Sequence, residues 1–144
     1  MADTFLKEDA IEALKGKSIL FLGDSIMRNI YQDLVTLLYD GRLTKHEILR
    51  RKGEMIPDHH GDRLVNHTGK LTAGRNYREE REMMMRDQRL TMRYCFLTRC
   101  WSYYLQEYLD AVKREDRGHP DLVLVLSCLW DINRYILKYL EDDI

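Results

Sequence analysis

The 144 residues suffice for one domain with a substantial core, and we expect that domain to span residues 1–144. The 23 basic and 24 acidic residues leave a net charge of −1, which gives no reason to expect a nucleic acid or a membrane surface as partner. There is neither a run of about 18 apolar residues, as a membrane-spanning helix needs, nor a signal peptide. We therefore expect an intracellular protein, cytoplasmic or nuclear.

The first predicted elements are a helix, a strand and a second helix. Apolar residues recur on one face of a short helix over residues 4–15. Residues 18–22, SILFL, form a continuous apolar run, which is typical of a strand in a parallel sheet that is covered on both faces. From Asp24 onward the apolar spacing becomes helical, and Gly41 is a natural end for the predicted helix.

Residues 41–87 carry many charges and little periodicity. We predict a long excursion here, with a short helix near residues 45–51 and turns at HHGD and TAGRN. A connection of this length within a domain usually has a function or is poorly ordered. The three consecutive methionines at 83–85 indicate a buried helix or strand rather than a soft-metal site.

The last part of the chain alternates again between strand and helix. Residues 89–97 predict a strand, residues 101–112 a helix, and the apolar run at 122–126 another strand, which a further helix follows. This order predicts an α/β fold in which strand 18–22 lies between the other two and all three are parallel. Strand 122–126 would then be an unprotected apolar edge, which favours self-association or a protein partner.

The tripeptide Gly23-Asp24-Ser25 lies where the first strand ends and a helix begins. Ligands bind at the carboxyl ends of the strands in such sheets. Ser25 would sit at a helix N-terminus, where unpaired N–H groups and the helix dipole stabilise negative charge. Asp and Ser are also the ordinary helix-capping residues, so the tripeptide alone fits a plain cap as well.

Four longer segments carry a family resemblance. FLGDSIMRNIYQDLVTLL resembles the first block of the GDSL/SGNH hydrolases and, more narrowly, of the PC-esterase domain proteins. GRNYREERE, YCFLTRCWSYYLQEYL and PDLVLVLSCLWDINRY are similar to later segments of that family, in the same order. The resemblance covers roughly residues 17–135. It implies a flavodoxin-like three-layer α/β/α fold and an acyl-ester hydrolase or acyltransferase, with Ser25 as nucleophile and its backbone N–H as an oxyanion donor.

The other site residues that the resemblance implies match less closely. Family members supply a glycine N–H from a second block, for which Gly74, followed closely by Asn76, is the best candidate. Their third block places an asparagine before an aspartate, where this chain has Trp130 before Asp131. The indole N–H of Trp130 can donate a hydrogen bond, and Asn133 could replace it if the turn is bulged.

The resemblance also implies a histidine base, held in a DxxH block after a later strand. All five histidines precede strand 122–126, so that place is not filled, and the domain resembles one that is incomplete at its C-terminus. We therefore expect little or no turnover of the unknown ester substrate, and a catalytically silent interaction protein remains the alternative. We expect no cofactor and no metal, because phosphate-binding glycine motifs are missing and the adjacent residues of DHHGD rarely converge on one ion.

Overall fold

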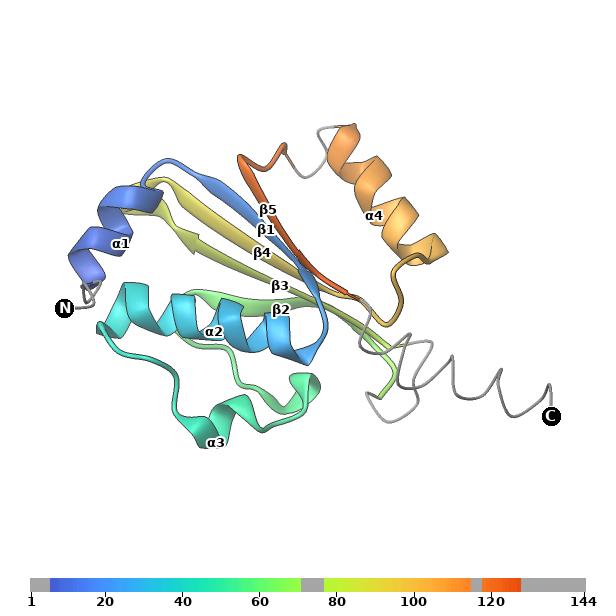
Figure 1. Ribbon diagram of the computed structural model, residues 1–144, viewed down its shortest axis with the longest axis horizontal. Helices are drawn as coiled ribbons and strands as arrows, with labels where there is room; N and C mark the ends of the chain where they lie inside the picture. The colour runs from blue at the N-terminus through green and yellow to red at the C-terminus, as the bar shows by residue number, and fades with distance from the viewer. Residues whose placement is uncertain (1–5, 71–76, 115–117, 128–144) are drawn as a thin grey trace.

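The computed structural model describes residues 6–70, 77–114 and 118–127, which form a five-stranded sheet between two layers of helices. Figure 1 shows α1 (Lys7–Leu14) and α2 (Ser25–Asp40) on one face of the sheet and α4 (Tyr103–Lys113) on the other. The five strands are β1 (Ser18–Gly23), β2 (Asp62–Thr68), β3 (Arg78–Met85), β4 (Leu90–Phe96) and β5 (Leu122–Leu126). The expected three-layer α/β/α arrangement is thereby confirmed.

The strand order is β2-β3-β4-β1-β5, so β1 lies between β4 and β5 as predicted. Both of these neighbours run parallel to β1. Gly23, the last residue of β1, lies opposite Phe96 of β4 and Leu126 of β5. The carboxyl ends of the three parallel strands therefore meet at one edge of the sheet, which we call the carboxyl rim.

The excursion contains more regular structure than the sequence predicted. The short helix is present as α3 (His46–Leu49), and a 3₁₀ turn, η1, follows at Gly53–Met55. Two strands were not predicted: β2 pairs antiparallel with β3, and β3 pairs antiparallel with β4. The expectation of a parallel sheet thus holds for β4, β1 and β5, while β2 and β3 make the whole sheet mixed. The methionine run lies in β3, where Met83 and Met85 are buried.

Each face of the sheet has its own apolar core. Phe21 of β1 and Tyr94 of β4 pack against Tyr31 of α2, and α1 joins this layer. On the opposite face, alternate residues of β1 and β4 pack against Leu105 and Tyr108 of α4. Continuous apolar runs in the parallel strands therefore serve two cores at once, because successive side chains point to opposite faces.

Helix α2 carries the polar residues of the rim, and its ends are well defined. It ends at Gly41, which has φ 68° and donates its N–H to Leu37 O at 2.9 Å. Only glycine adopts this left-handed conformation without strain, so the predicted stop at Gly41 is confirmed. The helix predicted after strand 122–126 lies outside the described residues.

Candidate active site

At the turn from β1 into α2, the adjacent residues Asp24 and Ser25 have different roles. Asp24 is the N-cap of α2, and its Oδ1 accepts the N–H of Ile26 at 2.9 Å. Ser25 is the first helical residue and is half-buried. Among the described residues, none forms a hydrogen bond with the Ser25 hydroxyl. Because Asp24 already caps the helix, helix capping explains the presence of Asp24 but not that of the Ser25 hydroxyl.

The neighbouring strands β4 and β5 hold this turn in place. The carbonyl of Gly23 accepts the N–H of Leu97 at 2.8 Å, and the Tyr94 hydroxyl donates to the carbonyls of both Gly23 and Asp24, at 3.2 and 2.9 Å. Burial raises the pKa of Tyr94 well above its ordinary value, so its hydroxyl stays protonated as a donor. A Cβ on Gly23 would lie 2.6 Å from the carbonyl oxygen of Leu126, so only glycine fits here.

A buried ion pair lies one helical turn beyond Ser25. The Arg28 guanidinium donates from Nη1 to Oε2 of Glu79 at 2.7 Å, and the two side chains are 2% and 0% exposed. The Tyr77 hydroxyl donates to the same Glu79 oxygen at 2.7 Å. Burial, followed by the nearby Glu79 charge, raises the pKa of Tyr77. The ion pair joins the first turns of α2 to the start of β3.

Arg81 extends this ion pair into a network of four charges. Its Nη1 lies 2.7 Å from Asp62 Oδ2, and its Nε lies 3.3 Å from Glu79 Oε1. Asp62 also accepts hydrogen bonds from Tyr31 and Gln32 of α2, at 2.7 and 3.1 Å. Two cations and two anions are thus buried together with hydrogen-bonding partners, which is the condition under which buried charges are tolerated.

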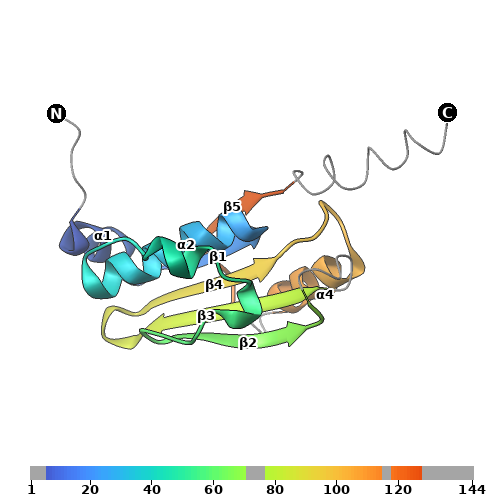
Figure 2. The same cartoon turned by 90° about the horizontal axis from the view of Figure 1, so that it is seen from below.

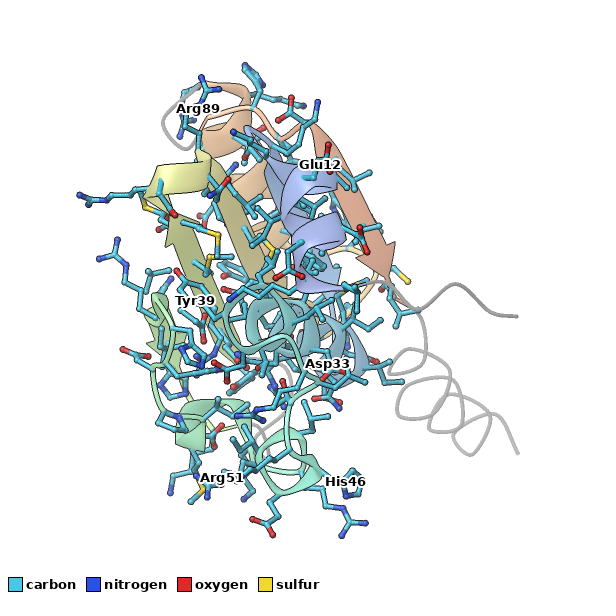
Figure 3. All side chains as sticks on the ribbon, turned by 90° about the vertical axis from the view of Figure 1, so that its left-hand side faces the viewer. Glu12, Asp33, Tyr39, His46, Arg51 and Arg89 are labelled. Carbon is cyan, nitrogen blue, oxygen red and sulfur yellow. The ribbon has the colours of Figure 1, made fainter. Side chains whose placement is uncertain are left out.

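The excursion closes over this network. Arg81 donates from Nη2 to the carbonyls of Gly53 and Ile56, at 3.2 and 2.7 Å. A Cβ on Gly53 would overlap the Glu79 carboxylate and lie 2.5 Å from Arg28 Nη1, so the backbone of η1 packs directly on the ion pair. Figure 3 shows Arg51, just before η1, at the end of the molecule that this excursion forms. The excursion is therefore fixed to the sheet by buried charge.

The part of the chain that the structure describes forms two hollows beyond the carboxyl ends of the strands, with volumes of about 450 and 480 Å³. The larger one is lined from β2, β3, the β4–α4 connection and the start of α4, by Thr68, Tyr77, Arg78, Thr98, Ser102, Tyr103 and Tyr104. The Arg78 guanidinium lies over the Tyr104 ring, 4.5 Å from its centroid. These hollows lie at the same end of the sheet as Ser25, although Ser25 lines neither of them, and they combine space, aromatic surface and positive charge, which are usual properties of a ligand site.

The structure places two of the predicted site residues. Ser25 and Asp24 are at the rim, whereas the other candidates lie outside the described residues; these are Gly74, Asn76, Trp130, Asp131 and Asn133. Sequence reasoning did not identify Arg28, Glu79 or Tyr77 near the rim. The only signal was an arginine one turn after the serine, and it did not indicate which residues would surround it.

One Asp-x-x-His spacing does occur, from Asp116 to His119, although it precedes β5. β5 runs parallel to β1 with Leu122 opposite Ile19, so His119 lies beyond the amino ends of these strands. At about 3.3 Å per residue, His119 and Ser25 are separated by about 13 Å or more along the strand direction. Asp116 is outside the described residues, and His119 cannot act as the base for Ser25 in this arrangement.

The other histidines have different settings. His60 Nε2 lies 2.9 Å from Asp40 Oδ2 and its ring stacks on Tyr39, which Figure 3 labels. His67 of β2 packs edge-on against the Tyr77 ring, with centroids 5.7 Å apart.

Within residues 6–70, 77–114 and 118–127, no three His, Cys, Asp or Glu side chains are grouped so that they could hold a metal ion. In the same residues, no helix is long and apolar enough to cross a membrane.

Comparison with known proteins identifies relatives of the chain. It is 42% identical over 126 residues to human PC-esterase domain-containing protein 1B and 38% identical over 133 residues to the mouse 1A protein. These alignments cover 86% and 91% of this chain but only 28% and 29% of the relatives, so the chain spans less than a third of their length. No protein-family model and no solved structure matches it. On the strength of these relatives, the chain belongs to the family of PC-esterase domain-containing proteins.

Proposed function

We propose that Ser25 is the nucleophile of an acyl-ester hydrolase or acyltransferase of the GDSL/SGNH type. One observation carries this proposal: Asp24 caps α2, and the Ser25 hydroxyl stands at the helix N-terminus without a partner among the described residues. The names of the relatives, which refer to a PC-esterase domain, support the same reaction class.

In the proposed reaction, the Ser25 oxygen attacks the acyl carbon of an ester while a base takes the hydroxyl proton. The tetrahedral oxyanion would be stabilised by the backbone N–H of Ser25 and by the dipole of α2. Collapse breaks the bond to the leaving alcohol, which takes the proton back from the base. The base then takes a proton from water or a second alcohol, which attacks the acyl carbon of the acyl-serine. The bond from the acyl carbon to the Ser25 oxygen breaks and that oxygen takes the proton from the base, which gives hydrolysis or acyl transfer.

We assign the remaining oxyanion donors to Gly74, with Asn76 close to it in sequence, and to Trp130, or to Asn133 if the turn is bulged, with Asp131 beside them. Each such donor contributes about 10²–10³-fold to turnover. These assignments rest on the family resemblance.

The proposed reaction also needs a base that accepts the Ser25 proton, and the described residues place no histidine there. None of their histidines contacts Ser25, and His119 lies at the opposite end of the sheet. We therefore propose that the 144-residue chain alone turns over little ester. In this proposal the base comes from additional sequence, of the kind that the longer relatives carry outside the matched region. The second candidate function is a catalytically silent interaction protein with the same fold, favoured by this missing contact.

The experiment uses a chimera in which the part of human PC-esterase domain-containing protein 1B that follows the matched region is fused after residue 144. Hydrolysis of p-nitrophenyl acetate is measured for the chimera and for its Ser25→Ala variant. We expect Ser25→Ala to reduce turnover about 10³-fold or more, as loss of a nucleophile does. Ser18→Ala, at the amino end of the strand that precedes Ser25, is the matched control and should leave turnover unchanged. A folded but inactive chimera would favour the silent alternative.

A further inference from the structure

The larger of the two hollows at the carboxyl rim has the features of an anion site. The described residues that line it include one cation, Arg78, and no carboxylate. They come from β2, β3, the β4–α4 connection and the start of α4. Figure 2 shows β2 and β5 at opposite edges of the sheet, so a strand added beyond β5 would lie about 19 Å from β3. The hollow is therefore formed by described elements at the edge of the sheet away from β5.

Arg78 is held in place without being neutralised. Its guanidinium lies over the Tyr104 ring, 4.5 Å from the centroid, and stacking leaves the N–H groups at its edge available. Among the described residues, none accepts a hydrogen bond from this guanidinium. The next two residues of β3 are acidic but engaged elsewhere. Glu79 pairs with Arg28 on the opposite face of the sheet. Glu80 is 2% exposed and accepts the Tyr104 hydroxyl.

The first turn of α4 adds main-chain donors to the same hollow. Ser102 is the N-cap of α4, and its Oγ accepts the N–H of Leu105 at 3.1 Å. The N–H groups of Tyr103 and Tyr104 have no acceptor among the described residues, and both residues line the hollow. The N–H groups of a first helical turn point out of the helix end, which the helix dipole makes positive. The hollow thus combines two free main-chain donors with a cation.

A buried hydroxyl is an independent sign of a ligand. Thr98 is 8% exposed and lines both hollows. Its hydroxyl forms no hydrogen bond with any described residue. A hydroxyl that is buried to this extent ordinarily has a hydrogen-bonding partner, because burying it unpaired costs free energy. The position of Thr98 therefore indicates that a polar group occupies the larger hollow when the site is filled.

We propose that the larger hollow binds a phosphate monoester, with its phosphate between Arg78 and the N-terminus of α4. A guanidinium and the N–H groups of a helix N-terminus are donors that proteins commonly use for phosphate. The Thr98 hydroxyl donates to a further phosphate oxygen. Donors from three parts of the chain match the three terminal oxygens of a phosphate monoester better than the two oxygens of a carboxylate.

The size and the aromatic wall of the larger hollow indicate an organic phosphate. Its volume of about 480 Å³ exceeds the need of an inorganic ion and lies within the range of small-molecule sites. Tyr103 lines the hollow and is 92% exposed, so its ring is available to the organic group of the ester. A phosphate monoester with an aromatic group therefore fits both ends of the site.

The test is a titration of the 144-residue chain with phenyl phosphate at constant ionic strength, followed by amide NMR spectra. We expect saturable shifts of the Tyr103 and Tyr104 amide signals, with a dissociation constant of about 1 mM or less. Arg78→Met should raise this constant at least about tenfold and Thr98→Val about threefold, because each removes donors and keeps a similar side-chain size. Arg86→Met is the matched control and should leave the constant unchanged. Arg86 is exposed, lies just beyond the far end of β3 and carries the same charge.

The class of ligand has its own comparison. Inorganic phosphate lacks the aromatic group and benzoate lacks the third oxygen, so each should bind at least about fivefold more weakly than phenyl phosphate. The proposal is overturned if phenyl phosphate gives no saturable shifts at Tyr103 and Tyr104, if Arg78→Met binds like Arg86→Met, or if benzoate binds as tightly as phenyl phosphate. The spectra also show whether each variant is folded, and the titration of the parent chain is decisive without the variants. None of these outcomes depends on the reaction proposed for Ser25.

Discussion

Replacing Arg81 by methionine should severely destabilise the fold, because Arg81 is the centre of the buried charge network. Its side chain is 0% exposed and contacts Asp62 at 2.7 Å and Glu79 at 3.3 Å. Methionine has a similar length but no charge and no donors. The Arg81→Met variant would leave Asp62 buried without its closest cation, and the carbonyls of Gly53 and Ile56 would lose the Nη2 donor.

Breaking a buried ion pair from one side typically costs about 3–5 kcal/mol. Set against a total stability of about 5–15 kcal/mol for a domain, that is about a fifth of the free energy of unfolding or more. The matched control is Arg63→Met in β2. Arg63 lies 3.7 Å from Glu82 and its side chain is 62% exposed, so its loss should cost about 0.2–1 kcal/mol.

The assay is urea unfolding of the two variants and the parent, followed by circular dichroism and extrapolated to water. Both substitutions remove one positive charge and introduce the same side chain, so their difference isolates burial. Equal losses of stability in Arg81→Met and Arg63→Met would refute the buried network as a main support of the excursion.

Three further results are expected. Gly23→Ala should cost about 1–3 kcal/mol in urea unfolding, since its Cβ would lie 2.5 Å from Met27 Cβ; wild-type stability would contradict the packing of the turn. The hydrogen bond from His60 lowers the pKa of Asp40 below 3.8, so this pair stabilises the fold above that pH and ceases to do so as pH falls through the folded-state pKa. Asp40→Asn should therefore lose stability above pH 3.8 and match the parent in stronger acid, and a pH-independent loss would contradict this. Burial raises the pKa of Tyr77, which stabilises the fold below pH 10 and loses that effect as pH rises further, so the part of the tyrosinate absorbance that Tyr77→Phe removes should appear only with alkaline unfolding, and its appearance in the folded protein would contradict this.

The parallel half of the sheet could be predicted because its sequence follows simple rules. β1 and β5 are continuous apolar runs, and α2 begins at a capping aspartate and ends at a glycine. Such local signals reflect burial on both sheet faces and the geometry of helix ends. They require no knowledge of distant contacts.

The antiparallel half could not be predicted, because its inward positions are charged. Glu79 and Arg81 of β3 point into the same layer as Met83, so the strand shows no alternation of apolar and polar residues. Their burial is possible only because Arg28 and Asp62, from α2 and β2, lie opposite them. Sequence patterns report burial of apolar groups and do not report which distant charges will pair.

At the site, the sequence placed Asp24 and Ser25 at the rim but could not divide their roles. The division depends on which side chain reaches Ile26 N–H, and the structure assigns that contact to Asp24. The spacing of Asp116 and His119 illustrates the opposite case. It has the form of a catalytic pair, yet strand direction puts His119 at the wrong end of the sheet.

The role proposed for Ser25 is tested most directly by fluorophosphonate labelling, read by intact mass and peptide mapping. The account predicts that the chimera extended with the relative's downstream sequence is labelled at Ser25 and that its Ser25→Ala variant is not. The 144-residue chain should label slowly or not at all, because its hydroxyl stays protonated without a base. A folded chimera that remains unlabelled at Ser25, or rapid labelling of the 144-residue chain at this residue, would contradict the account.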